Sequence, residues 1–148
     1  MTNHPSFVKF ITLTTLLAST LHCKADSKPG FACPEQISQP SIMLKDVGPG
    51  WRTYVTSPLY LHSVAPTDGP PERLGQLMGK QVQTGRNAWT DTYDLRGPFP
   101  DGKWLQCSYG MLNEIVLSKR LDDSVMSCTI RGKKGEKAGQ NVFSVDCR

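Results

Sequence analysis

Cysteine is the residue type whose number and spacing are most informative about chemistry in this chain. Five cysteines occur in 148 residues, at Cys23, Cys33, Cys107, Cys128 and Cys147. The last four could bind zinc as thiolates, or they could form two disulfides in an oxidising compartment. Zinc sites usually contain a closely spaced C-x-x-C pair, and these cysteines lie far apart. The spacing therefore favours disulfides, and we expect no metal and no other cofactor.

Four cysteines allow three pairings, and the sequence leaves all three open. Segments 125–131 and 141–147 alternate as strands do, and a loop rich in glycine and lysine joins them. A hairpin of this kind would bring Cys128 close to Cys147. The remaining bridge would then tie the N-terminal segment to the sheet. We therefore favour the pairs Cys128–Cys147 and Cys33–Cys107.

Catalytic groups other than cysteine are few. His62 is the one histidine after residue 25, so any site of the Ser-His-Asp or Cys-His type depends on it. It alternates with leucines in its segment, and we expect it to face solvent. Asp91 and Asp94 could flank a glycosidic bond, but a spacing of three in a strand points them to opposite faces. No G-x-S-x-G, H-E-x-x-H or phosphate-binding loop occurs. The sequence thus predicts a protein that is not an enzyme.

The first 25 residues have the pattern of an export signal. A polar, basic start is followed by an apolar run at 10–21, which is too short to span a membrane. We expect cleavage after Ala25, which leaves 26–148 as a single periplasmic domain. The alternative is a lipoprotein acylated at Cys23. It is disfavoured because His22 is not the small residue that such processing requires.

The charge balance argues against nucleic-acid binding. The chain has 17 Lys and Arg against 13 Asp and Glu. Two of the basic residues, Lys9 and Lys24, lie within the first 25 residues, so the mature chain is less basic than the whole. We expect a protein partner, no nucleic acid and no membrane span, and the oligomeric state stays open. Trp51, Trp89 and Trp104 are expected in the core. Two surfaces are candidates for the partner: a basic hairpin with Arg131, Lys133, Lys134 and Lys137, and an aromatic surface with Tyr54, Tyr60 and His62.

Short alternating segments separated by glycine and proline predict a chain made mostly of strands. Strands are expected at 41–45, 51–56, 59–64, 87–95, 104–110, 114–121, 125–131 and 141–147. Pro70 and Pro71 suit the first turn of a helix, and Leu74, Leu77 and Met78 would give it an apolar face. The predicted fold class is α+β, mostly β. It consists of an antiparallel meander sheet with one short helix and two disulfides.

Several motifs of the mature chain resemble a family of small exported bacterial proteins of unassigned biochemistry. They are Cys33-Pro34, Gly50-Trp51, Gly69-Pro70-Pro71-Glu72 and Trp104-Leu105-x-Cys107-x-Tyr109. The resemblance covers nearly the whole mature chain. Members are periplasmic, and some are linked to type VI secretion gene clusters, in which such proteins usually serve as immunity proteins. The motifs carry no catalytic residues over to this chain.

The resemblance, together with export and disulfides, implies a periplasmic immunity protein that neutralises a toxin of the cell envelope. We expect inhibition by occlusion, in which a loop or strand edge fills the toxin's active site. The alternatives are an inhibitor of foreign lysozyme-type hydrolases, a structural envelope protein, and a cell-wall hydrolase acting through His62, Asp91 and Asp94.

Overall fold

The computed structural model describes residues 31–148. The predicted signal peptide at 1–25, its cleavage after Ala25 and the alternative acylation of Cys23 lie outside the described residues. Within the described range the chain forms eight strands and two single turns of 3-10 helix, η1 at Gln39–Ser41 and η2 at Pro71–Arg73. The protein is therefore mostly β, as predicted, and the described residues contain no α-helix.

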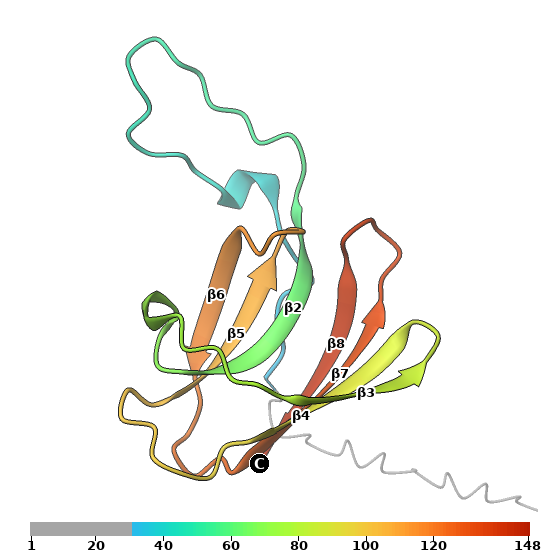
Figure 1. Cartoon of the computed structure of the whole chain (residues 1–148). Coiled ribbons are helices and arrows are strands. Elements are labelled where there is room, and N and C mark those ends of the chain that lie inside the picture. Colours follow the sequence, from blue (N-terminus) through green and yellow to red (C-terminus); the bar gives the residue numbers. More distant parts are fainter. Residues whose placement is uncertain (1–30) are drawn as a thin grey trace, which may run out of the picture.

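The strands form two four-stranded antiparallel sheets (Figure 1). The first sheet has the order β1-β2-β5-β6, with bounds Gln36–Ile37, Leu59–Asp68, Lys103–Tyr109 and Ile115–Arg120. The second has the order β3-β4-β7-β8, with bounds Lys80–Gly85, Ala88–Asp94, Ser127–Lys134 and Asn141–Cys147. Consecutive strand pairs alternate between the sheets. The prediction of one continuous meander is therefore wrong in its topology.

The core lies between the two sheets, where β2 approaches β7 and β8. Alternation along each strand directs one set of apolar side chains inward. Leu61 and Val64 on β2 meet Ile130 on β7, and all three are buried. Tyr109, at the end of β5, is fully buried. The remaining core residues are Leu95, Leu105, Cys107, Leu121, Val125 and Cys128.

Two disulfides fasten this sandwich, with the pairing that the sequence favours. The N-terminal disulfide joins Cys33 to Cys107 on β5, with a Cα–Cα distance of 5.8 Å. The hairpin disulfide joins Cys128 to Cys147, which are directly paired residues on β7 and β8. The first bridge attaches the segment before β1 to the first sheet, and the second closes the C-terminal hairpin.

The expected helix after Pro70 is wrong beyond its first turn. Leu74 has a left-handed φ of 53°, which ends η2 after three residues. The chain then turns back to β2, where the Asp68 N–H donates to the Gly75 carbonyl at 2.8 Å. Of the expected apolar face, Leu74 and Met78 are instead 83% and 96% exposed, and only Leu77 packs against the core. Pairing with β2 thus replaces helix formation.

The strand predictions fail at β1, at β3 and at segments 41–45 and 51–56. The two-residue strand β1 was not expected. Strand β3 was not expected, because it is an edge strand whose six residues are all exposed and carries only one apolar residue, Val82. Segments 41–45 and 51–56 were expected as strands but form none. No neighbouring strand offers them backbone partners, so their alternation alone does not produce a sheet.

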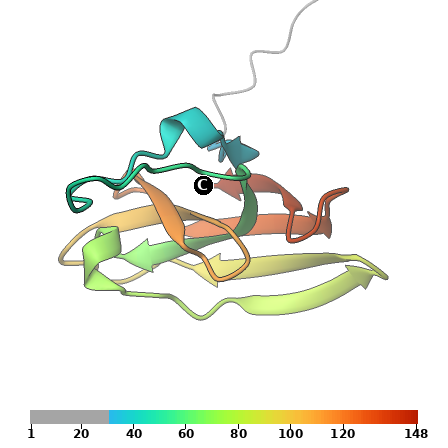
Figure 2. The ribbon, with the colours of Figure 1, turned by 90° about the horizontal axis from the view of Figure 1, so that it is seen from above.

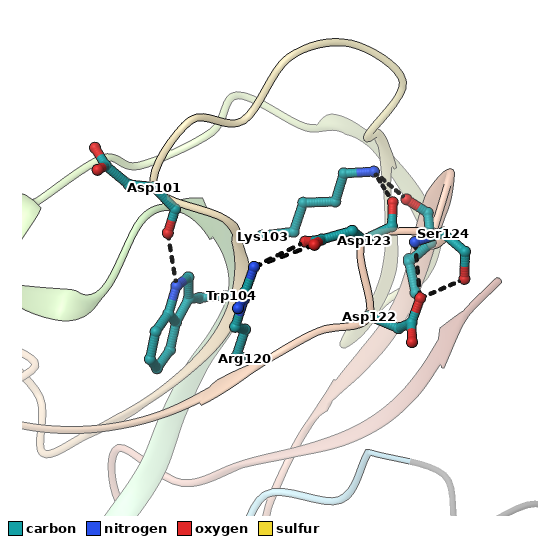
Figure 3. A network of polar contacts seen from close by, with 8 residues as sticks. Asp101, Lys103, Trp104, Arg120, Asp122, Asp123 and Ser124 are labelled. Atoms are coloured by element: carbon teal, nitrogen blue, oxygen red, sulfur yellow. Dashed lines mark hydrogen bonds and ion pairs between the residues drawn. The ribbon is translucent and has the colours of Figure 1, made fainter.

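A buried lysine holds the connection between the sheets (Figure 3). Lys103 is only 6% exposed, and its Nζ donates to the carbonyls of Asp123 at 2.8 Å and Val125 at 2.7 Å. The Leu121 N–H donates to the Lys103 carbonyl at 2.8 Å. The Lys103 ammonium also lies 5.4 Å from the ring centroid of Phe99. These contacts fix residues 121–126 over the start of β5, at the end of the molecule opposite the β5–β6 turn.

Candidate partner-binding end of the molecule

A long exposed segment projects from one end of the sandwich (Figure 1). We call residues 42–58, between η1 and β2, the arm. Trp51 and Tyr54 on the arm are 77% and 82% exposed. The expectation that Trp51 belongs to the core is therefore wrong, whereas Trp89 and Trp104 are half-buried. Figure 2 views the molecule from above and shows the arm well apart from the β3–β4 hairpin.

Local contacts give the arm a defined shape. At its base, the Gln39 side-chain amide on η1 donates to the Val55 carbonyl at 3.3 Å. At its tip, the Trp51 N–H donates to the Gly48 carbonyl at 3.3 Å across Pro49 and Gly50. Gly50 has a φ of +84°, so this is a type II turn with proline and glycine at its two central positions. The turn holds the Trp51 ring against Gly48, close to where the arm reverses.

Two other loops lie at the base of the arm. The β5–β6 turn carries Met111 and Leu112, which are 68% and 84% exposed. A Cβ on Gly139, in the β7–β8 loop, would lie 2.7 Å from Met111 Cγ, so the two loops touch. A surface cavity of about 270 Å³ is bordered by residues of all three loops and by Tyr60. We call the arm, the turn 110–114 and the loop 135–140 together the arm end.

His62 joins the first sheet to the β7–β8 loop. Its Nδ1 donates to the Gly139 carbonyl at 2.9 Å, and the Asn141 side-chain amide donates back to the His62 carbonyl at 2.6 Å. His62 is half-buried, so the expectation that it faces solvent is wrong. A local strand pattern cannot show a contact to a residue 77 positions away. Through Nδ1, the His62 side chain holds the β7–β8 loop against the first sheet.

The structure divides the predicted basic cluster. Lys137 lies in the β7–β8 loop at the arm end, and Lys133 and Lys134 lie just before it; all three are exposed. Lys134 extends over the Trp89 ring, with Nζ 5.8 Å from the centroid. Arg131 lies further down β7, where it pairs with Thr90 and Ser144 and alternates with buried Ile130. It therefore faces away from the core and apart from the arm end.

The carboxylate pair considered for hydrolysis does not share a face. Asp91 is buried opposite Ile130, whereas Asp94 is exposed and its carboxylate accepts from Arg96 at 2.6 and 2.9 Å. These hydrogen bonds hold the pKa of Asp94 well below its usual range. Burial, with a smaller contribution from Asp91, raises the pKa of Tyr93. The geometry expected of two acids flanking one glycosidic bond is absent from this pair.

Among residues 31–148, no three His, Cys, Asp or Glu side chains are grouped so as to hold a metal ion. In the same range no helix is long and apolar enough to cross a membrane.

The sequence predictions missed several exposed apolar residues of the arm end, among them Trp51, Met111 and Leu112. Two signals were available. Gly48-Pro49-Gly50 is a strong turn signal, and it precedes Trp51 directly. Met111 and Leu112 lie in a predicted turn, where large apolar side chains have no core to join. Tyr54 and Tyr60, which were predicted, lie on the arm and at the arm end.

Comparison with known proteins identifies the family. No curated protein and no solved structure matches the chain. Residues 56–148 match the family described as the type VI secretion system Tli immunity protein. The match covers more than half of the chain and includes strands β2 to β8 with the hairpin disulfide. The family association that the motifs implied is thereby confirmed, and the chain belongs to the type VI secretion system Tli immunity proteins.

Proposed function

We propose that this chain is a periplasmic immunity protein that neutralises a type VI secretion toxin acting on the cell envelope, by covering the toxin's active site. Membership of the Tli immunity family supports a toxin as the partner. The observation that carries the mode of action is the arm, which exposes Trp51 and Tyr54 to solvent on a scaffold that two disulfides cross-link. Large exposed aromatic side chains of this kind are typical anchors of protein interfaces.

Two features support action outside the cytoplasm. Disulfides persist in oxidising compartments such as the periplasm, and this small domain has two. The segment 1–25 also has the pattern of a secretory signal. An immunity protein in the periplasm would meet a toxin that acts on the envelope before the toxin reaches its substrate.

Occlusion suits the shape of the arm end. A projecting segment with aromatic side chains can enter a cleft of the toxin. The arm and the β5–β6 turn supply apolar contact area, and the β7–β8 hairpin supplies positive charge. The inhibitor then needs no catalytic group of its own, because it acts by excluding the substrate.

Co-production with the toxin encoded beside this chain tests the proposal. The toxin is exported to the periplasm of a susceptible bacterium, together with either the full chain or a form that lacks residues 1–25. The full chain should restore growth and the leaderless form should not. An inactivated toxin serves as the control for toxicity, and an assay against lysozyme tests the alternative target. Absence of rescue by an accumulated, disulfide-bonded full chain would overturn the proposal.

A further inference from the structure

We propose that the arm is the element by which this chain holds its toxin, with Trp51 and Tyr54 entering an apolar cleft of the toxin and Lys133 and Lys137 facing acidic side chains at the rim of that cleft. This inference rests on the proposed function. It names the binding surface, the anchors within it and the chemistry of the surface that they meet.

Exposed apolar side chains are concentrated on the arm. Besides Trp51 and Tyr54, the arm exposes Met43, Leu44 and Val47, with exposed fractions between 46% and 76%. Met111 and Leu112 extend this surface across the β5–β6 turn at the base of the arm. Several large exposed apolar side chains grouped on one segment indicate a site of protein contact. In a family whose partner is a toxin, the toxin is the protein that covers it.

The arm is ordered before it meets a partner. The Gln39–Val55 hydrogen bond closes its base, and the type II turn at Pro49-Gly50 fixes its tip. The limbs between these points enclose a surface cavity of about 360 Å³, lined in part by Ile42, Leu44 and Tyr54. Less conformational entropy is lost on binding when a loop already has its bound shape. The two aromatic anchors are thus presented at low entropic cost.

The family match begins at residue 56, and the arm lies almost entirely before that point. The segment that carries Trp51 and Tyr54 therefore lies outside the matched residues. Strands β2 to β8 lie within the matched residues and form most of the scaffold from which the arm projects. Binding residues commonly lie on loops that a rigid scaffold positions, which supports the arm as the binding element.

Positive charge beside the arm end indicates that the partner's surface is acidic. Lys133, Lys134 and Lys137 surround the β7–β8 hairpin, where Glu136 is the one acidic residue of segment 131–140. All four are exposed. Lys134 is drawn toward Trp89, which leaves Lys133 and Lys137 as the freer cations. Exposed charges at the rim of an interface mainly accelerate association, so they steer an acidic surface toward the arm.

Binding kinetics with the purified toxin separate these roles. Trp51→Ala should raise Kd by roughly 30-fold or more and Tyr54→Ala by about tenfold, through faster dissociation. Lys133→Gln with Lys137→Gln should slow association by about three- to tenfold at low salt, with dissociation unchanged. Leu74→Ala and Met78→Ala remove equally exposed apolar side chains from the opposite end of β2, and they should change Kd less than twofold.

The outcomes distinguish the inference from the function on which it rests. A wild-type protein that does not bind the toxin overturns the proposed function. A wild-type protein that binds, with Kd unchanged by Trp51→Ala and Tyr54→Ala together, overturns the inference alone. Melting temperatures of the variants must equal that of the wild type, which the high exposure of these side chains predicts. Equal losses in the arm variants and in the Leu74 and Met78 controls would also overturn it.

Discussion

Replacement of Lys103 by methionine should destabilise the protein strongly, although lysine is usually a surface residue. Methionine keeps the unbranched apolar stem of the side chain and removes only the ammonium. Two backbone carbonyls, those of Asp123 and Val125, then lose their donor. The Val125 carbonyl contact is buried, whereas that of Asp123 is half-buried and can accept from water.

The size of the effect follows from these two carbonyls. Hydrogen bonds to a charged donor contribute about 1.5–3 kcal/mol each, and a buried carbonyl without a donor costs about 1–3 kcal/mol. Release of the ammonium from a buried position offsets part of this loss. We therefore expect Lys103→Met to lower the free energy of unfolding by about 2–4 kcal/mol, a large share of the roughly 5–15 kcal/mol that stabilises a typical domain.

Urea denaturation of the disulfide-bonded protein, followed by tryptophan fluorescence, measures this change. Lys80→Met on the exposed edge strand β3 is the matched control, and it should stay within about 0.5 kcal/mol of the wild type. A loss below about 1 kcal/mol in Lys103→Met would refute the reasoning. It would mean that other donors satisfy both carbonyls and that the network of Figure 3 does not hold the connection between the sheets.

Three further predictions concern the scaffold. Replacing the two cysteines of the N-terminal disulfide by alanine should lower the free energy of unfolding by about 4 kcal/mol, since the bridge joins residues 74 positions apart. The same change at the hairpin disulfide, which joins residues 19 positions apart, should lower it by about 3 kcal/mol. Urea denaturation measures both changes. Burial raises the pKa of Tyr109 to about 12. The unfolded chain therefore loses this proton at lower pH than the folded chain, so the free energy of unfolding should fall by about 2–3 kcal/mol between about pH 10 and 12. Tyr109→Phe should remove most of that fall without loss at neutral pH, because the hydroxyl has no hydrogen-bond partner among the described residues; an unchanged alkaline profile would contradict this. Gly132→Ala should lower the melting temperature, because its Cβ would lie 2.5 Å from the Trp89 ring, whereas Gly85→Ala, with only the Ala88 Cβ at 3.7 Å, should not.

The parts of the fold that the sequence predicts are those encoded by local patterns. The C-terminal hairpin and its disulfide follow from two alternating segments around a loop of glycine and lysine. Strand β3 could not be found in this way, because an exposed edge strand needs no apolar alternation and gains its structure from pairing with β4. The short helix failed for the opposite reason, since an apolar spacing at Leu74 and Met78 was present but had no core to cover.

Local sequence patterns also predict only part of the arm end. Segment 51–56 alternates like a strand, but a strand forms only where a neighbour supplies backbone partners, and the arm has none. Tyr54 was nonetheless predicted as part of a partner-binding surface, and it is 82% exposed. The contact between His62 and Gly139 joins residues 77 positions apart, so no local signal could reveal it. It is this contact that places the basic hairpin beside the arm.

Inhibition of the purified toxin measures the central claim most directly. The toxin's enzymatic activity is followed while the purified, disulfide-bonded protein is added, and the bound fraction is determined in parallel. Blocking of the active site by the arm end predicts that activity falls in proportion to the bound fraction and approaches zero at saturation. A toxin that is saturated with the protein and still turns over its substrate at the free rate would contradict the account.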